Sequence, residues 1–261
     1  MTQPVEKPLK GGNTTPVARL GDQVLREAGP WTGTVQKLLT HCREAGIEWC
    51  PEPQGWATDG RETLSYLRGK VPSYPLPEWV YADEVLVTAA TWLRQLHDAT
   101  VDFDSPDCTW RAPRHQPAEV VCHNDFAPYN FVFRDHQLVG VIDWDFASPG
   151  PRLWDLAYLA YRMVPLMGPD NPNSPTTTKN LMARLRLLRD TYGSTASTQE
   201  ILATVVARLD ELADFTRGQA KTSKNPELLD HVRDYSTDAD FLRLNYDGSV
   251  NVLEAARAAG V

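Results

Sequence analysis

The stretch His123-Asn-Asp-Phe-Ala-Pro-Tyr-Asn130, followed shortly by Val141-Ile-Asp-Trp-Asp145, is the most informative feature of the chain. Asp125 offers a carboxylate that can accept a proton from an attacking hydroxyl. Asn130 and Asp143 offer hard oxygen atoms of the kind that Mg²⁺ prefers as ligands. The stretch therefore predicts a divalent-cation site beside a proton acceptor, the set of groups that phosphoryl transfer requires.

The flanking residues predict how these side chains are presented. Three short β-prone runs lie at Glu119–Cys122, Phe131–Phe133 and Leu138–Ile142. Between the first two runs lies a loop in which Pro128 argues against a helix. The other two runs and the polar turn 134–137 predict a hairpin. Asp143 then follows the last strand, so we expect Asn130 and Asp143 to converge on one ion.

These motifs resemble a known family. HNDFAPYN fits the H-x-D-x-x-x-x-N catalytic loop of the aminoglycoside phosphotransferase and choline kinase superfamily, a branch of the protein-kinase-like fold. VIDWD is similar to its metal-binding aspartate segment. Pro149–Ala157 is similar to its later aspartate motif, with Asp155 at a helix start. Three motifs in this order are specific, whereas one alone would be weak. The resemblance is strong over the middle of the chain and looser toward both ends.

The resemblance implies an α+β, bilobal protein-kinase-like fold. Residues 1–68 would form a small nucleotide-binding β-sheet lobe with one helix, and residues 69–261 a larger, mainly helical catalytic and acceptor-binding lobe. It implies Mg²⁺-dependent transfer of the terminal phosphoryl group of ATP or GTP to a hydroxyl of a small molecule, aminoglycoside-like or otherwise amino-bearing. Asp125 would be the base, Asn130 and Asp143 the metal ligands, and His123 a support of the catalytic loop.

Each residue also has a simpler interpretation. An aspartate in a polar loop is most often a turn former. His123 alone suits a structural hydrogen bond, and Asn130 alone suits a cap or turn. Asp145 is expected to be solvated rather than a second ligand. Asp155 is expected to be structural, because a helix N-terminus offers N–H groups to a carboxylate. For the base and the two metal ligands taken together, the functional interpretation is favoured.

The N-terminal residues predict a nucleotide-binding sheet. Two short runs, 16–20 and 23–27, flank the turn Gly21-Asp22 and predict a hairpin. Gly11 and Gly12 can let backbone N–H groups approach phosphates, although taken alone they are better explained as a turn. The strand 62–67 ends where a kinase-like fold would hinge. The resemblance therefore places backbone groups of Tyr66 and Leu67 against the adenine.

The chain departs from its relatives at the expected Lys–Glu pair. Arg26 stands at the strand position of the lysine, and Val35-Gln36 stands where the helix glutamate is expected. The ion pair is therefore missing or rebuilt, because arginine differs from lysine in reach and donor geometry. Arg26 as a plain surface residue is nearly as good an interpretation.

The rest of the chain predicts helices. Thr32 or Thr34 is expected to cap a helix that ends at Gly46. Apolar stripes and caps predict further helices over 86–96 and 181–188, after the capping box Ser197–Glu200, after Asn225-Pro226, and between Ser249 and Gly260. Four acidic residues are candidates for a cation-binding wall, each with a solvated helix charge as the alternative: Asp230, Asp234, Asp238 and Asp240.

Composition limits the partners. The 261 residues carry a net charge of -8 without dense basic clusters, which argues against nucleic acid and favours a cationic small molecule. No apolar run reaches the ~18 residues of a membrane helix. The four cysteines have no C-x-x-C spacing and the N-terminus is polar, so free thiols and a cytoplasmic location are expected.

Two rival functions stay open at this point. A non-catalytic kinase-like nucleotide-binding protein is suggested by the missing Lys–Glu pair. A metal-dependent phosphoesterase would use His123 as a ligand beside Asp125, Asp143 and Asp145, and would release free phosphate. The order and spacing of the motifs favour the kinase-like interpretation over both.

Overall fold

The computed structural model describes residues 5–9, 16–175, 180–223 and 225–245. The chain groups into two compact units built from interleaved stretches. The first unit takes residues up to 71, 95–125 and 130–151, and the second takes 72–94, 126–129 and the residues from 152 onward. The predicted lobes 1–68 and 69–261 follow chain order instead, and that boundary stays a prediction.

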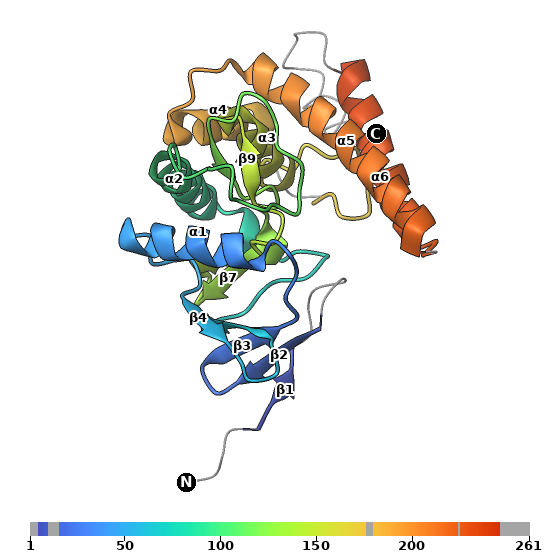
Figure 1. Ribbon diagram of the computed structural model, residues 1–261. Coiled ribbons are helices and arrows are strands. Elements are labelled where there is room, and N and C mark those ends of the chain that lie inside the picture. Colours follow the sequence, from blue (N-terminus) through green and yellow to red (C-terminus); the bar gives the residue numbers. More distant parts are fainter. Residues whose placement is uncertain (1–4, 10–15, 176–179, 224, 246–261) are drawn as a thin grey trace. The chain divides into compact units, whose positions relative to one another are not determined.

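The first unit begins with a five-stranded antiparallel sheet of order β1-β2-β3-β5-β4 (Figure 1). Its strands are β1 Lys7–Pro8, β2 Val17–Leu20, β3 Gln23–Arg26, β4 Pro53–Trp56 and β5 Glu62–Ser65. Gly21 adopts φ 63° in the turn between β2 and β3, which confirms the predicted hairpin. Gly11 and Gly12 lie outside the described residues.

Helix α1, Thr32–Glu44, lies beside β4 and buries a stripe of Val35, Leu38, Leu39 and Cys42. The predicted threonine cap is wrong. The cap residue is Trp31, without a side-chain hydrogen bond. The threonine hydroxyls are used elsewhere, because Thr32 Oγ1 accepts from the Gly29 N–H at 2.9 Å and Thr34 Oγ1 from the Thr109 N–H at 2.9 Å. Gly46, at φ 84°, follows the helix end as predicted.

Four short strands hold the catalytic stretch. β7 Phe131–Arg134 and β8 Gln137–Val141 form the predicted hairpin, with positive φ at both turn residues, 135 and 136. β6 Val120–Cys122 pairs with β9 Ser148–Gly150, which the sequence did not predict because Ser-Pro-Gly lacks β-prone side chains. Pro128 does not exclude helical structure: a 3₁₀ turn, η2 Pro128–Asn130, begins at it, since its fixed φ suits a first helical position.

Gly69 lies against the β7–β8 hairpin at the predicted hinge. Lys70 and Phe133 exchange both backbone hydrogen bonds, each 2.8 Å long. A Cβ atom on Gly69 would lie 2.5 Å from Val132 Cγ1 and 2.6 Å from the carbonyl oxygen of Phe133. The backbone can approach this closely only because residue 69 has no side chain.

Substitution G69A should lower the free energy of unfolding by about 1–3 kcal/mol, because backbone atoms must move to admit the methyl group. The matched control is G33A. Gly33 is exposed within α1 and a Cβ there would meet nothing within 4 Å, so alanine should add about 0.5–1 kcal/mol. Urea unfolding midpoints measure both, and equal midpoints for the two variants would contradict the assignment.

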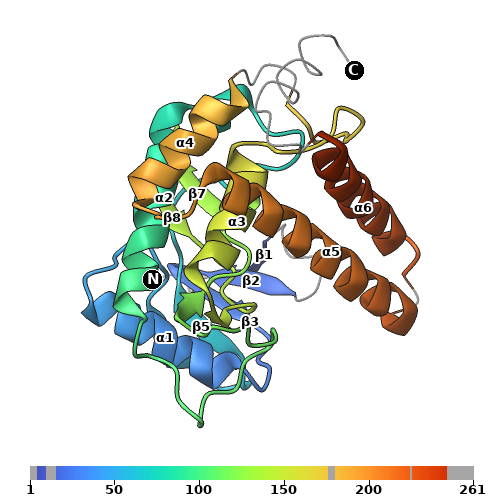
Figure 2. The ribbon, with the colours of Figure 1, turned by 90° about the horizontal axis from the view of Figure 1, so that it is seen from above.

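The second unit is mainly helical. It holds η1 Glu78–Tyr81, most of α2 Asp83–Ala99, α3 Arg152–Met163, α4 Leu181–Tyr192, α5 Thr198–Ser223 and α6 Leu228–Asn245. α5 and α6 lie side by side in both views (Figures 1 and 2). The predicted capping box is confirmed: Ser197 and Glu200 exchange hydrogen bonds of 2.7 to 3.2 Å at the start of α5. The helix predicted between Ser249 and Gly260 lies outside the described residues. No helix in the described part of the chain is both long and apolar enough to cross a membrane.

Asp238 is neither a solvated charge nor part of an exposed acidic wall. Its carboxylate is buried and accepts hydrogen bonds from the Tyr161 hydroxyl, the Gly168 N–H and the Asn171 amide, each at 2.7 Å. These bonds join α6 to α3 and to the segment that follows α3. Asp230 and Asp240 match the simpler interpretation, as exposed helix charges paired with Arg233 and Arg243 three residues away.

Candidate active site

Asp125 and Asn130 meet within the catalytic loop. The Asn130 amide nitrogen donates to the backbone oxygen of Asp125 at 2.9 Å and to its carboxylate Oδ2 at 2.8 Å. Both amide hydrogens are directed at Asp125, so the remaining polar atom of the Asn130 side chain is its Oδ1. The loop thus fixes the carboxylate and presents an amide oxygen beside it.

His123 contacts backbone groups of this loop and of the segment before Asp143. The ring is fully buried, and its Nε2 lies 3.2 Å from the backbone oxygen of Ile142. Its Nδ1 accepts from the Asp125 N–H at 3.3 Å. These two contacts are satisfied together by a neutral ring protonated on Nε2. The ring also packs edge-on against Trp144, with centroids 4.8 Å apart.

Asp143 follows β8, and the residue before it is joined to Asn130 by a backbone hydrogen bond. The N–H of Ile142 donates to the backbone oxygen of Asn130 at 2.9 Å. Asp143 itself has φ 63°, a left-handed conformation that costs a non-glycine residue free energy and often occurs at functional sites. Asn124, also at φ 63°, donates to the backbone oxygen of Phe146 and the hydroxyl of Ser148, which ties the loop to the segment after Asp143.

The electrostatics of this site suit a bound cation. Burial and, next in size, the nearby charge of Asp125 together raise the pKa of Asp143 to about 6, against the opposing effect of Arg26. A carboxylate whose pKa is raised by burial and by a neighbouring negative charge is stabilised in its ionised form by a bound divalent cation. The Asp143 side chain remains 40% exposed, and with Asn130 Oδ1 it provides hard oxygen donors. The residues present therefore fit Mg²⁺.

The basic–acidic pair that the sequence left open is rebuilt on the sheet. Arg26 on β3 faces Glu62 on β5 in register, and its Nε donates to the buried Glu62 carboxylate at 2.6 Å. The predicted helix position contributes only Gln36, whose amide lies 3.4 Å from Glu62. Arg26 is thus a buried ion-pair residue and not a plain surface arginine.

Asp145 was expected to be solvated, and this prediction is wrong. Its side chain is 8% exposed and lies between two arginines, because Oδ1 accepts from Arg26 Nη2 and Oδ2 lies 3.5 Å from Arg111 Nη1. Arg26 Nη1 also lies 3.8 Å from Asp143. No sequence motif includes Glu62 or Arg111, and both reach the site only through tertiary contacts.

The predicted adenine-contacting residues lie at the end of β5. The Tyr66 N–H already donates to the backbone oxygen of Asp22 at 2.8 Å, and the Arg19 guanidinium covers the Tyr66 ring at 3.8 Å. Leu67 packs against Gly140 of β8, where a Cβ atom would lie 2.6 Å from Leu67 Cδ1. Contact of these residues with adenine stays a prediction.

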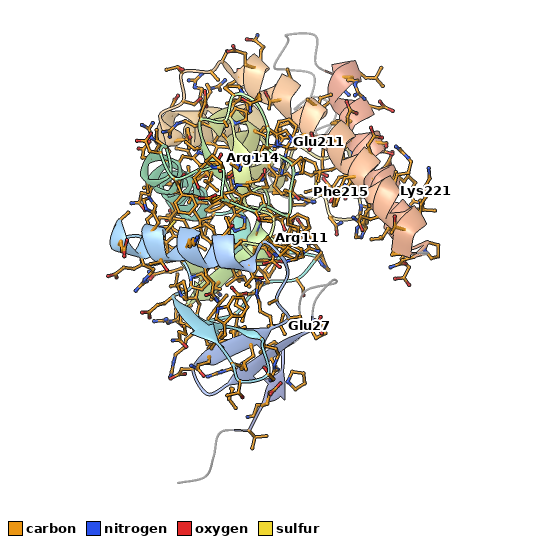
Figure 3. The ribbon with its side chains drawn as sticks, viewed as in Figure 1. Glu27, Arg111, Arg114, Glu211, Phe215 and Lys221 are labelled. Carbon is orange, nitrogen blue, oxygen red and sulfur yellow. The ribbon has the colours of Figure 1, made fainter. Side chains whose placement is uncertain are left out.

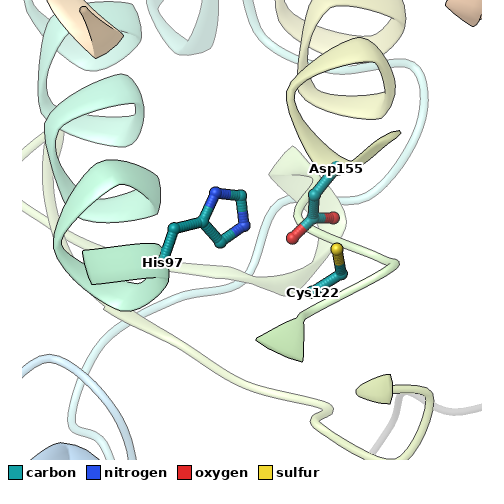
Figure 4. A group of neighbouring side chains, drawn as sticks. All are labelled: His97, Cys122 and Asp155. Carbon is teal, nitrogen blue, oxygen red and sulfur yellow. The ribbon is translucent and has the colours of Figure 1, made fainter. Parts of the chain in front are cut away.

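Figure 4 shows three further buried side chains of types that can bind a metal ion: His97, Cys122 and Asp155. His97 and Cys122 belong to the first unit, and their ligand-type atoms lie within 4.8 Å of one another. Asp155 lies in the first turn of α3 and is fully buried, at the helix start that the sequence predicted. Cys42, Cys50 and Cys108 are free thiols, also as predicted.

The chain was compared with protein-family models and with known proteins. Residues 89–188 match the model of a family described as the phosphotransferase enzyme family. A trifolitoxin immunity protein of Rhizobium leguminosarum bv. trifolii is 35% identical over 194 residues, which cover 71% of this chain and 73% of that protein.

Solved structures share the fold. A choline/ethanolamine kinase family protein from Mesorhizobium loti matches with a TM-score of 0.59 and 17% identity, covering 98% of this chain and 92% of that one. A spectinomycin phosphotransferase in complex with ADP and spectinomycin matches with a TM-score of 0.57 and 13% identity, covering 98% and 93%. At these identities the likeness concerns the fold, which is the protein-kinase-like fold that the sequence motifs predicted.

Proposed function

This chain belongs to the phosphotransferase enzyme family, and from that premise we propose that it transfers the terminal phosphoryl group of ATP or GTP to a hydroxyl of a small molecule in the presence of Mg²⁺. One observation carries the proposal. Asn130 is hydrogen-bonded to the Asp125 carboxylate, and the charge of Asp125 reaches Asp143, so the residues proposed as proton acceptor and cation ligands lie near one another.

Each residue then has one role. Asp125 orients the acceptor hydroxyl and takes its proton, which is the work of a general base. Asn130 Oδ1 and the Asp143 carboxylate would hold Mg²⁺, which when bound neutralises charge on the phosphate oxygens. His123 keeps the Asp125 backbone in place through its Nδ1. Proton acceptance and cation binding are thereby separated onto neighbouring side chains.

The acceptor is proposed to be a small, amino-bearing compound with antimicrobial action. The net charge of -8 favours a cationic acceptor. The similar proteins include an immunity protein, a choline/ethanolamine kinase family protein and a spectinomycin phosphotransferase. Modification of such a compound would protect the cell that carries this chain, and action inside that cell would make the enzyme cytoplasmic.

The rival functions lose their main support. The non-catalytic interpretation rested on a missing basic–acidic pair, but an ion pair between Arg26 and Glu62 is present on the sheet, so its absence no longer argues for that interpretation. The phosphoesterase interpretation requires His123 as a metal ligand. Both ring nitrogens of His123 instead lie within reach of backbone groups, those of Ile142 and Asp125.

Cells that express the wild type should resist at least one compound in a panel of amino-bearing antimicrobials, and cells that express D125A should not. The same compound should receive labelled phosphate from γ-labelled ATP or GTP when the purified wild type is added. D102A is the matched control, because Asp102 is an exposed aspartate outside the site. Equal resistance in D125A cells, or release of free phosphate without transfer, would count against the proposal.

A further inference from the structure

We propose that Arg111 is the residue that contacts the phosphate groups of the nucleotide, a task that the strand position of Arg26 would otherwise suggest. This inference rests on the proposed function, because it names how the same site meets its donor. Arg111 lies on the loop that connects α2 to β6, and Figure 3 labels it.

Arg26 is unsuited to this task because protein carboxylates already surround it. Its Nε binds Glu62, its Nη2 binds Asp145 and its Nη1 lies 3.8 Å from Asp143. One positive charge thus faces three negative ones, with the Arg26 side chain only 10% exposed. A polyphosphate that bound the Nε or Nη2 donors of Arg26 would have to displace a carboxylate from them, which leaves a buried charge unpaired.

Arg111 has fewer carboxylate neighbours than Arg26. Among the described residues its one hydrogen-bond acceptor is Asp145 Oδ2, at 3.5 Å, which is the outer limit for such a bond. Its side chain is 23% exposed. Most of its N–H donors therefore lack a protein acceptor in the described part of the chain. A planar guanidinium with open donors suits phosphate oxygens, which it can bind in pairs.

Two aromatic rings fix the orientation of the Arg111 guanidinium. Its carbon lies 4.6 Å from the centroid of the Trp31 ring and 4.5 Å from that of Phe146. Cation–π stacking leaves the N–H edge of an arginine available while fixing its plane. Gly29 permits this arrangement, because a Cβ atom at that position would lie 2.5 Å from the Trp31 ring.

The backbone around Arg111 is fastened on both sides. The N–H of Thr109 donates to Thr34 Oγ1 of α1 at 2.9 Å, and the backbone oxygen of Pro113 accepts from the Ser148 hydroxyl at 2.9 Å. A loop held at these two points presents its side chain at little further entropic cost when a ligand binds. Arg111 is thus preorganised, as residues of a binding site usually are.

The position of Arg111 links it to the metal-binding residues. Asp145, which shares its two carboxylate oxygens between Arg26 and Arg111, lies two residues after Asp143. Four carboxylates gather here (Asp125, Asp143, Asp145 and Glu62) against the two arginines, a balance of two minus four, or -2. A Mg²⁺ ion would only balance this charge. A bound polyphosphate then requires a cation that the carboxylates do not already saturate, and Arg111 meets that requirement.

The test compares R111Q with the wild type in equilibrium binding. Calorimetry measures affinity for non-hydrolysable analogues of ATP and GTP with Mg²⁺, and NMR titration measures affinity for adenosine and guanosine, which lack phosphates. R111Q should bind the preferred triphosphate about tenfold or more weakly, since charge-assisted hydrogen bonds are lost, and should bind the nucleoside as the wild type does. R114Q is the matched control: Arg114 lies on the same loop, pairs with Asp104 and is also labelled in Figure 3. It should change neither affinity.

The outcomes separate this inference from the proposed function. If the wild type binds no triphosphate, the proposed function itself fails. If the wild type binds it and R111Q binds it equally well, the assignment of Arg111 is overturned while the proposed function stands. If R111Q weakens nucleoside and triphosphate binding to the same extent, Arg111 is only structural, and the inference is again overturned.

Should R111Q not fold, R111K decides the question. Lysine keeps the charge and loses the planar fork, so we expect weaker triphosphate binding with unchanged nucleoside binding. Unchanged triphosphate binding by a folded R111K, verified by its urea midpoint, would overturn the assignment.

Discussion

In the variant D125N, the rate of phosphoryl transfer should fall by about 10²- to 10⁴-fold, the usual contribution of a general base, while affinity for Mg²⁺-nucleotide stays close to that of the wild type. An asparagine side chain has the same shape as aspartate, and its oxygen can still accept the hydrogen bond that Asn130 donates to Asp125 at 2.8 Å. What is lost is the negative charge that takes a proton from the acceptor hydroxyl.

The measurement has two parts because binding and chemistry must be separated. Single-turnover transfer of labelled phosphate, with the acceptor found in the susceptibility panel, gives the rate. Calorimetry gives the nucleotide affinity. D102N is the control, since Asp102 is exposed on the loop after α2 and lies outside the site. A D125N enzyme with the full transfer rate would remove Asp125 from the mechanism, whereas loss of nucleotide affinity in step with the rate would show that the substitution disturbed the loop.

In the variant D143A, Mg²⁺-dependent nucleotide binding should become undetectable, a loss of about 100-fold or more. Loss of a partner around a metal ligand already costs 10- to 100-fold, and here a ligand itself is removed. The Asp143 carboxylate is held beside Asp125 and Arg26, with its pKa raised to about 6 by burial and by Asp125. Without it, Asn130 Oδ1 would be the only proposed protein ligand of the ion.

The comparison requires a companion that preserves the backbone. Asp143 has φ 63°, which asparagine tolerates better than alanine, so D143N separates loss of charge from backbone strain. Both variants should lose the difference between nucleotide affinity with Mg²⁺ and with EDTA. D107A, an exposed aspartate of the same unit, should keep that difference. Unchanged Mg²⁺-nucleotide affinity in D143N would show that the ion, if bound, has other ligands.

Local sequence was sufficient for most elements. The β2–β3 and β7–β8 hairpins, the buried stripe of α1 and the capping box of α5 all formed where alternation, turn residues and caps predicted them. Their signals depend on neighbours within a few residues. β9 was missed because Ser-Pro-Gly becomes a strand only by pairing with β6, and the α1 cap was misassigned because a distant backbone group, the N–H of Thr109, binds the Thr34 hydroxyl.

The proximity of the proposed base and metal ligands follows from the local sequence. Asp125 and Asn130 lie five residues apart in one loop, so short-range geometry brings them together, and the backbone bond from Ile142 to Asn130 adds Asp143. The partners of Arg26 and Arg111 depend on the tertiary structure alone. Arg26 meets Glu62 across 36 residues and Asp145 across 119, while Arg111 lies between Trp31 and Phe146. Which charged residues form buried ion pairs depends on the tertiary fold that brings them together and removes them from water. The sequence near either residue does not predict a partner so far away in the chain.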